Sequence, residues 1–322
     1  MISRVADSLF WLGRFLERAE STARVLSVTR NLSLDGELAP RQAWFPAVVV
    51  FGEQERFRAK AGDAAFEDGE AVQQHLTWED GAASIALAVR AARENTRAIR
   101  DVVSLETWES VNALHLWMAG EGRATYAQDR HGFYRSVRDA VQRTVGAVHG
   151  TMSHDDAFDF ILLGLVLERA GQTARTLDVH HHALTGVHRV VETALWLALL
   201  RACSGFEAYM KRFQGQASAA TVARFLVLDA RFPRSVIHCL DDAMERLARI
   251  RSPAADARGQ SLPRLRALAA WVLDEAEPAV DGGALHDLLT HVVDETHAVC
   301  ADIGRELLGD ADPAPAPASV PQ

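Results

Sequence analysis

The same twelve-residue pattern occurs twice in this chain, and it constrains the fold more than any other feature. Residues 13–24 read GRFLERAESTAR and residues 164–175 read GLVLERAGQTAR, with eight identities in register. Further positions match at the same offset of 151 residues, such as Ser84 with Ser235 and Ile99 with Ile250. A constant offset predicts a tandem duplication whose two halves bury their apolar faces against each other around an approximate two-fold axis.

Helical patterning dominates the rest of the chain. The 322 residues include only 10 prolines, four of them in the last ten positions, and apolar residues recur at helical spacing. We therefore predict an all-α fold, a multi-helix bundle built from the internal tandem duplication with pseudo-two-fold symmetry. The expected helices cover residues 3–31, 83–103, 105–119, 131–150, 155–183, 186–213, 217–227, 233–251, 262–276 and 283–308.

The domain organisation follows from the repeat. Halves that need each other to bury their apolar faces form one body, which we place at residues 1–308, with halves of about 1–151 and 152–308. The Pro/Ala-rich residues 309–322 are expected to be a disordered tail. The stretch WFPAVVVFG at residues 44–52 favours a short buried helix after Pro46 over a strand. Ser153 with Asp156 predicts a capping box for the helix that carries the second copy.

Charge and cysteine usage exclude several classes of function. A formal net charge of −9 disfavours a main role in non-specific binding to nucleic acid or to an anionic membrane. Three distant cysteines without CxxC spacing are typical of a reducing compartment and indicate neither a disulfide framework nor a zinc site. No early apolar stretch resembles a signal peptide, and the run ALWLALL is far shorter than the roughly 20 residues of a membrane span. We expect a cytoplasmic protein that spans no membrane.

The repeated pattern places charged residues on defined lines of a helix. On a helical wheel, Gly13, Glu17 and Arg24 fall within about 40° of one another, while Arg18 lies on the far side of the apolar stripe. Glu17 and Arg24 are two turns apart, about 10 Å along the axis, so each needs a partner elsewhere. The second copy repeats this arrangement with Gly164, Glu168, Arg169 and Arg175.

Two interpretations of this pattern remain open. In the structural one, the glycines allow close helix approach and each glutamate pairs with arginines of the opposite copy, because a buried carboxylate needs such partners. In the functional one, the same groups line a ligand pocket in which Glu17 or Glu168 acts as general acid or base. The structural interpretation is favoured, since ion-pair networks in helical cores are commoner than catalytic ones and perturb pKa values equally well.

At this point the motifs resemble a known family. SRVADSLFWLGRFLERAESTARVL, AARENTRAIRDVVSLETWESVN, LERAGQTARTLDV and DARFPRSVIHCL are similar to the alpha-E family, a domain of unknown function, and the similarity runs up to the proline-rich tail. The resemblance implies an all-helical protein encoded beside, or fused to, a circularly permuted ATP-grasp ligase, often with a transglutaminase-like peptidase nearby. It thus implies a role in ATP-dependent synthesis or modification of a peptide, with ATP and Mg²⁺ on the partner ligase and no cofactor on this chain.

The second copy departs from the pattern expected of the family. Leu165 stands where an arginine is expected, and Gly171 stands where an acidic residue is expected. The first copy, which keeps Arg14 and Glu20, is therefore the better candidate for contacts that carry function. The alternative for Arg14 is a solvated surface position.

One constellation is not duplicated. Four arginines fall within about 80° on one predicted helix, beside Glu94 and Asn95. Their counterparts 151 residues later are Asp241, Met244, Ala248 and Arg251, so the second half lacks most of this basic stripe. The stripe is either a solvated face or a site for a carboxylate, a phosphate or an acidic partner surface, because guanidinium groups bind oxyanions in a bidentate way. The four arginines are Arg90, Arg93, Arg97 and Arg100.

The sequence thus predicts a non-catalytic helical companion of an ATP-grasp peptide ligase, with a peptide or another acidic ligand as a further candidate partner. The alternatives are an enzyme that uses Glu17 or Glu168 in an arginine-lined pocket, and a helical module that binds RNA or an acyl carrier. No metal site is predicted, since the adjacent His180, His181 and His182 point in different directions on a helix. The candidate binding residues are Arg14, Arg18, Arg24, Arg90, Arg93, Asn95, Arg97, Arg100, Arg169 and Arg175.

Overall fold

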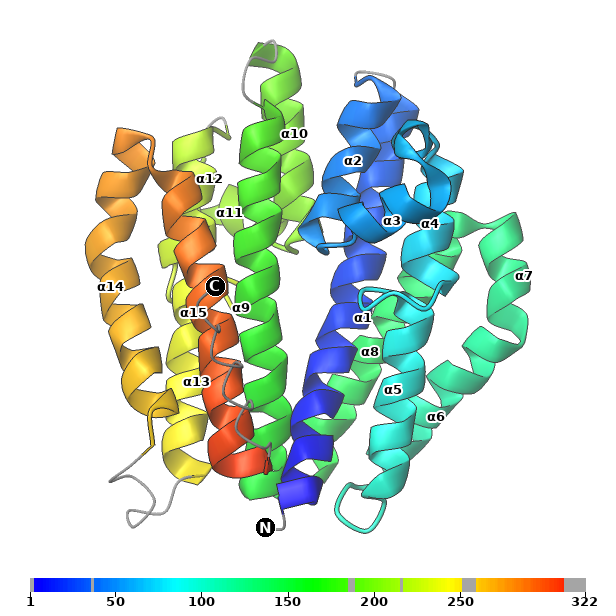
Figure 1. Ribbon diagram of the computed structural model, residues 1–322, viewed down its shortest axis with the longest axis vertical. Coiled ribbons are helices and arrows are strands. Elements are labelled where there is room, and N and C mark those ends of the chain that lie inside the picture. The colour runs from blue at the N-terminus through cyan, green and yellow to red at the C-terminus, as the bar shows by residue number, and fades with distance from the viewer. Residues whose placement is uncertain (1–2, 36–37, 185–188, 215–216, 251–258, 310–322) are drawn as a thin grey trace, which may run out of the picture.

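Two long helices form the centre of the molecule. The computed structural model describes residues 3–35, 38–184, 189–214, 217–250 and 259–309, and over these residues it contains fifteen α-helices and no strand. Helices α1 (Ser3–Asp35) and α9 (Asp156–Leu184) carry the two copies of the repeated pattern and pack directly against each other. In Figure 1 they stand side by side, with the other helices arranged around them.

Glycine permits the close approach of these two helices. A Cβ atom added to Gly13 would lie 1.9 Å from the carbonyl oxygen of Ile161, and one added to Gly164 would lie 2.0 Å from that of Phe10. Neither position therefore accepts any side chain without separating the helices. Leu12 and Leu16 of α1, which are fully buried, add apolar contacts that stabilise the fold by about 1.5–3 kcal/mol each.

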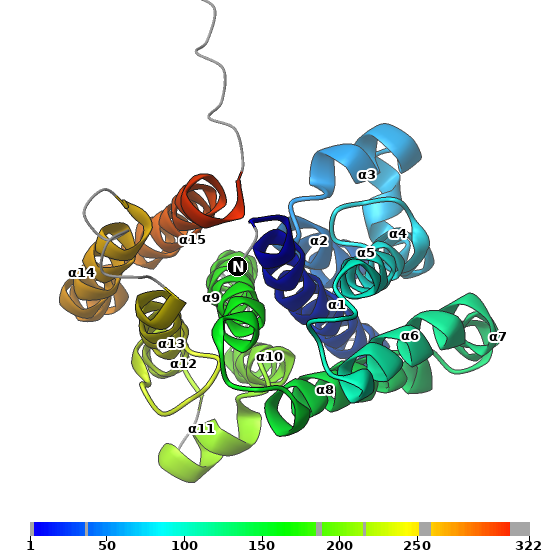
Figure 2. The same cartoon turned by 90° about the horizontal axis from the view of Figure 1, so that it is seen from below.

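Each central helix has its own set of neighbours (Figures 1 and 2). Helices α5 (Ile85–Ala98) and α8 (Arg130–Thr151) pack on α1, and α6 (Leu105–Ala119) covers both of them. Helices α13 (Val236–Ile250) and α15 (Leu285–Ile303) pack on α9, and α14 (Ser261–Gly282) covers both of these. The π-helical turn η2 (Gly304–Leu308) continues α15 and contacts α1.

Shorter helices complete the molecule. Several helices of the fold, not only the shorter ones, begin where a side chain caps the backbone, because the first N–H groups of a helix lack partners within it. Ser84 Oγ accepts from Leu87 N at 3.4 Å before α5, and Ser235 Oγ accepts from His238 N at 3.2 Å before α13. The shorter elements are α2 (Pro40–Val50), α3 (Gln54–Ala61), η1 (Asp63–Glu67), α4 (Gly69–Trp78), α7 (Glu121–Gln128), α10 (Arg189–Ala202), α11 (Phe206–Arg212) and α12 (Ala219–Leu228).

The structure corrects several boundaries predicted from the sequence. The helix expected after Pro46 begins at Pro40 instead and contains Pro46, because Ala47, Val48 and other buried residues hold it in place despite the missing N–H group. The alternative of a strand over residues 44–52 is wrong. Helices α3, α4 and α7 were not predicted. The first turn of α9 is capped by Asp155, whose Oδ1 accepts from Ala157 N at 3.0 Å, rather than by Ser153.

The single helix expected over residues 186–213 is also wrong. Its described part consists of α10 and α11, separated at Ser204, which has a positive φ of 55° and so ends the helix. The first residues of that predicted helix, and residues 310–322 of the expected tail, lie outside the described residues.

Candidate functional site

The carboxylate of Glu168 on α9 is held by two arginines of α1. Arg14 Nε donates to Glu168 Oε2 at 2.8 Å, and Arg18 donates through Nε to Oε1 at 2.8 Å and through Nη2 to Oε2 at 3.0 Å. Gln172 Nε2 adds a hydrogen bond of 3.2 Å to Oε1. Burial opposes ionisation of Glu168, but Arg14 and Arg18 outweigh it and lower its pKa to about 2. This side chain is therefore a carboxylate that is ionised at neutral pH and whose two oxygens both accept hydrogen bonds.

The carboxylate of Glu17 on α1 is held in the reciprocal way. Arg169 donates to Glu17 Oε2 through Nη2 at 2.7 Å and through Nε at 3.1 Å. Arg234 Nη1 donates to Oε1 at 2.5 Å, and Ser21 Oγ donates to the same oxygen at 3.1 Å. The Glu17 side chain has no exposed surface, so these bonds replace all of its contact with water.

Arg234 links Glu17 to a second buried carboxylate. Its Nη2 atom donates to Glu20 Oε2 at 2.9 Å, Gln142 Nε2 donates to Glu20 Oε1 at 3.1 Å, and Arg24 pairs with Glu20 from one turn along α1. Burial opposes ionisation of Glu20, but Arg234 and Arg24 outweigh it and lower its pKa to about 2. Arg234 was not predicted as a partner of either glutamate, although it lies in the segment DARFPRSVIHCL that resembles the family.

The contacts between the two copies recur at the offset of 151 residues. The pair Arg18 with Glu168 matches the pair Arg169 with Glu17. Hydrogen bonds from these side chains to the backbone match as well. Arg18 and Arg169 each also donate to a backbone carbonyl just before α5 or α13, and the threonine four residues after each arginine donates to the next carbonyl. These bonds are Arg18 Nη1 to Ala82 O (3.2 Å), Arg169 Nη1 to Pro233 O (3.4 Å), Thr22 Oγ1 to Ala83 O (3.1 Å) and Thr173 Oγ1 to Arg234 O (2.9 Å).

The two copies differ in the source of the second arginine that binds each glutamate. Arg14 provides it for Glu168, but the equivalent position in the second copy is Leu165, which is buried. Arg234, from the segment before α13, provides it for Glu17. Each carboxylate thus keeps two guanidinium partners, although the substitution at position 165 removes one of the expected ones.

The other two arginines of the repeated pattern bind different partners. Arg24 pairs with Glu20, and Arg175 Nη2 donates to His297 Nε2 at 2.6 Å. Burial and the charge of Arg175 lower the pKa of His297, in keeping with a neutral ring that accepts this bond. Arg14 is not solvated, because its guanidinium group is mostly buried and also lies 4.7 Å from the ring centroid of Trp11.

Arg90, Arg93 and Arg97 of the arginine stripe lie on α5, but Arg100 lies in the turn after α5 ends at Ala98, so the four do not share one helix as predicted. Arg93 Nε donates to Asn112 Oδ1 on α6 at 2.9 Å. Glu94 pairs with Arg93 at 2.7 Å and with Arg97 at 2.5 Å. The other members are placed as follows: Arg90 pairs with Asp80 at 3.0 Å, Arg100 lies 4.6 Å from the ring centroid of Trp108, and Asn95 is half-buried.

Exposed apolar side chains lie beside this stripe. Leu105 and Leu116 on α6 are 61% and 58% exposed. At 100° per residue they share one side of α6 with Trp108, which contacts Arg100, and Asn112, which contacts Arg93. Two exposed leucines and a group of cations therefore lie on the same side of the molecule.

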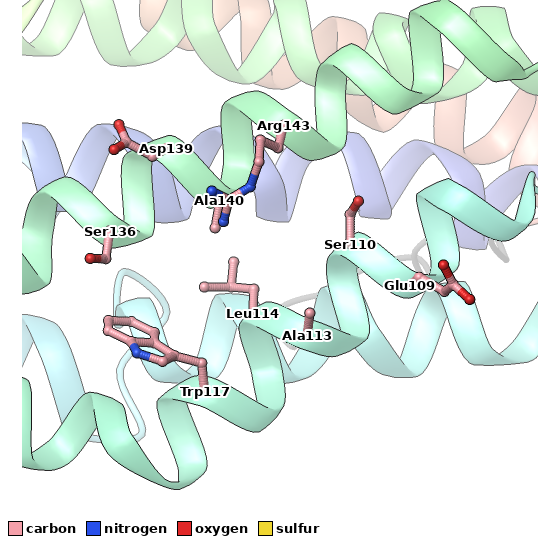
Figure 3. Close-up of a pocket in the computed structure, with 9 residues that line it drawn as sticks. All are labelled: Glu109, Ser110, Ala113, Leu114, Trp117, Ser136, Asp139, Ala140 and Arg143. Atoms are coloured by element: carbon pink, nitrogen blue, oxygen red, sulfur yellow. The ribbon is translucent and has the colours of Figure 1, made fainter.

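A groove opens on the other side of α6, against α8. It has a volume of about 520 Å³ and an apolar floor that includes Leu114 and Trp117. Arg143 extends from α8 into the space between the two helices, above Leu114 (Figure 3). Glu109, Asp139 and Arg143 form no ion pair within the described part of the chain. The other lining residues are Ser110, Ala113, Ser136 and Ala140.

The corresponding positions on α14 and α15 are arranged differently. Ala113 in the groove matches Arg264, whose side chain crosses from α14 to α15. Arg264 Nε donates to Asp302 Oδ2 at 2.8 Å, and Nη1 donates to Glu295 Oε2 at 3.1 Å. A long, paired side chain therefore occupies the position at which the α6–α8 groove has only a methyl group.

Comparison with protein families decides where the chain belongs. Residues 1–308 match the model of Alpha-E, described as a predicted alpha-helical domain with a conserved ER motif. The chain belongs to the Alpha-E family. The Glu-Arg dipeptides at residues 17–18 and 168–169, which face each other between α1 and α9, fit the two letters of that motif.

Relatives of this Alpha-E protein occur in mycobacteria. An uncharacterised protein of Mycobacterium bovis and two of Mycobacterium tuberculosis are each 26% identical to it over 282 residues. The alignment covers 80% of this chain but only 30% of each mycobacterial protein, so the chain spans less than a third of their length. No solved structure matches it.

Metal-binding clusters and membrane-spanning helices are both absent from the described residues. Among them, no group of three or more His, Cys, Asp or Glu side chains is placed to hold a metal ion. None of the described helices has the length and apolar character needed to cross a membrane.

Proposed function

We propose that this protein is a non-catalytic helical partner of an ATP-grasp peptide ligase, built from two halves related by tandem duplication and an approximate two-fold axis. The reciprocal contacts at the 151-residue offset support the duplication. The resemblance to the alpha-E family supports the ligase as partner. The relatives are more than three times as long as the matched region, which favours a unit that acts together with further protein.

The contacts of the buried glutamates argue against an enzyme that uses Glu17 or Glu168 as general acid or base. A general acid or base works best with a pKa near the operating pH, and the pKa of Glu168 is about 2. Both oxygens of Glu17 and of Glu168 also accept bonds from arginine, which leaves no free position for a substrate proton. We infer that this network fixes α1 against α9 and takes no part in chemistry.

The exposed side of α5 and α6 is the surface at which we expect the partner to bind. We define the α5–α6 face as Arg90, Arg97, Arg100, Leu105 and Leu116. It combines exposed leucines with guanidinium groups, and arginine is among the residues enriched in protein interfaces. The pairing of Arg90 with Asp80 and of Arg97 with Glu94 interrupts the positive charge, which favours a protein partner over a nucleic acid.

The test is complex formation with an ATP-grasp ligase of the kind that the family resemblance implies, taken from the same organism. We expect Leu116→Asp to weaken the complex at least tenfold, because a charge would be placed in an apolar contact, and to leave thermal unfolding unchanged. Leu273→Asp on α14 is the matched control, since Leu273 is 56% exposed and lies outside the α5–α6 face. Equal affinity of the two variants, or no complex with the unmodified chain, would overturn the proposal.

A further inference from the structure

A second cavity lies between α11, α12 and the turn that leads into α13. Its volume is about 770 Å³, within the range of roughly 300–1,000 Å³ common for small-molecule sites. Residues 229–233, which are the first five of the segment DARFPRSVIHCL, form one wall, and Lys211, Arg212 and Leu228 contribute to the others. The proposed partner role makes no use of this cavity.

The charges around this cavity do not balance. Three cationic residues, Lys211, Arg212 and Arg231, line the cavity together with a single carboxylate, that of Asp229. Asp229 is already bound, since Arg212 Nη1 donates to its Oδ2 at 2.5 Å and the Arg231 backbone N–H donates to its Oδ1 at 2.9 Å. Lys211 and the Arg231 side chain are exposed and have no ion-pair partner among the described residues. The cavity therefore has an excess of two positive charges in a chain whose net charge is −9.

An apolar wall adjoins these cations. The rings of Phe225 and Phe232 are stacked with centroids 4.6 Å apart and are buried beneath the cavity. Above them, half-buried Leu228 and exposed Pro233 present apolar surface to it. A ligand that fits must therefore combine an anionic group with an apolar body.

The wall of the cavity is rigidly attached to the core. Ser235 Oγ donates to the Asp229 carbonyl at 2.7 Å, and Arg169 Nη1 donates to the Pro233 carbonyl at 3.4 Å. Arg234, the next residue along, binds Glu17 and Glu20. Because these contacts hold the turn in place without a ligand, little conformational entropy is lost when one binds.

We propose that this cavity binds a small organic phosphate monoester, with the phosphate between Lys211, Arg212 and Arg231 and the organic group against Leu228 and Pro233. A phosphate monoester carries about −1.5 to −2 charges at pH 7 and three acceptor oxygens, which matches an excess of two cations. A carboxylate would neutralise only one of them. The inference goes beyond the proposed partner role and does not depend on it.

Three probes test the ligand class on the full chain: phenyl phosphate, benzoate and inorganic phosphate, titrated by calorimetry or NMR. We expect phenyl phosphate to bind at least tenfold more tightly than either of the others, because it alone has both the dianion and the apolar ring. Equal affinity for benzoate would overturn the assignment of a phosphate, and equal affinity for inorganic phosphate would overturn the role of the apolar wall. Tighter binding of a short single-stranded oligonucleotide would overturn the small-molecule class.

Variants test the site itself. Arg231→Gln and Lys211→Gln should each weaken phenyl phosphate binding at least fivefold without changing thermal unfolding, since both side chains are exposed. Arg266→Gln on α14 is the control for the loss of one exposed positive charge elsewhere. If the Arg231→Gln and Arg266→Gln variants bind phenyl phosphate with equal affinity, its phosphate group does not occupy this cavity.

Discussion

The interface between α1 and α9 and the α5–α6 face use the same residue types under opposite conditions. At the interface, Glu17 and Glu168 are buried and each is bound by two arginines from elsewhere in the fold. Beside the α5–α6 face, Glu94 also binds two arginines, of which Arg97 belongs to the face, but its side chain is 43% exposed and both partners are neighbours on the same helix.

The difference teaches that burial, rather than the number of contacts, decides what a glutamate–arginine cluster does. In the interior, removing one member leaves the others charged and without water, so the cluster holds the helices together. At the surface, water replaces a lost partner, so the same contacts contribute little to folding and stay available for another molecule.

The largest expected effect distinguishes these two clusters. Glu17→Ala should reduce the free energy of unfolding by about 3 kcal/mol or more, because the mostly buried Arg169 would lose its carboxylate partner and Arg234 would keep only Glu20. Glu94 also has two arginine partners, but Glu94→Ala should change the free energy of unfolding by less than about 0.5 kcal/mol. Chemical denaturation of both variants measures the contrast, and similar losses would contradict it.

A third charged cluster, around His75, makes the stability of the fold depend on pH. The buried His75 on α4 lies with Nδ1 2.6 Å from Glu79 Oε2 and Nε2 3.2 Å from Glu53 Oε2. Arg56 and Lys60 are the other charged groups at this cluster, 3.9 Å from Glu53 and 2.6 Å from Glu79. Burial opposes protonation of His75, but its bonds to the two glutamates outweigh burial and raise its pKa above the ordinary 6.5.

Because the folded-state pKa of His75 is the higher one, its contribution to stability is complete below about pH 6.5 and is lost as pH rises through the folded pKa. We expect the free energy of unfolding to fall between pH 6 and pH 9, by less than in Glu17→Ala, because the glutamates keep Lys60 and Arg56 as partners. Urea titrations at several pH values measure this slope. His75→Gln should flatten it, and an unchanged slope would show that another group titrates.

Much of the centre of the fold was predictable, because the repeated pattern carries it. The offset of 151 residues pointed to the facing glycines of α1 and α9, and buried carboxylates require cationic partners, so the pairing of Arg18 and Arg169 with the opposite glutamate could be anticipated. Helical periodicity located α5, α6, α8 and α13 within a few residues.

What escaped prediction depends on tertiary contacts. Arg234 reaches Glu17 from a turn 217 positions away, and no helical periodicity marks such a side chain. The short helices α3 and α4 hold together through the buried Phe57 and Val72 rather than through long amphipathic patterns. The break at Ser204 rests on a positive φ in a residue that rarely adopts it. The α6–α8 groove and the cavity beside α12 arise only when distant elements meet.

The smallest expected effect on folding belongs to the arginines of the α5–α6 face. The double variant Arg97→Ala with Arg100→Ala should change the free energy of unfolding by less than about 0.5 kcal/mol, since both side chains are exposed. Thermal and chemical unfolding measure this, and a large loss would place these arginines in an internal network instead.

The most direct test of the partner role is the affinity of the same double variant for the ligase, measured by titration at low and moderate salt together with ATP turnover. We predict at least a tenfold weaker complex at low salt and a smaller difference at moderate salt, because steering and pairing by exposed charges are screened. Full ligase activity should return once the ligase is saturated with the variant. Unchanged affinity with reduced turnover at saturation would contradict the account and assign these arginines to the reaction itself.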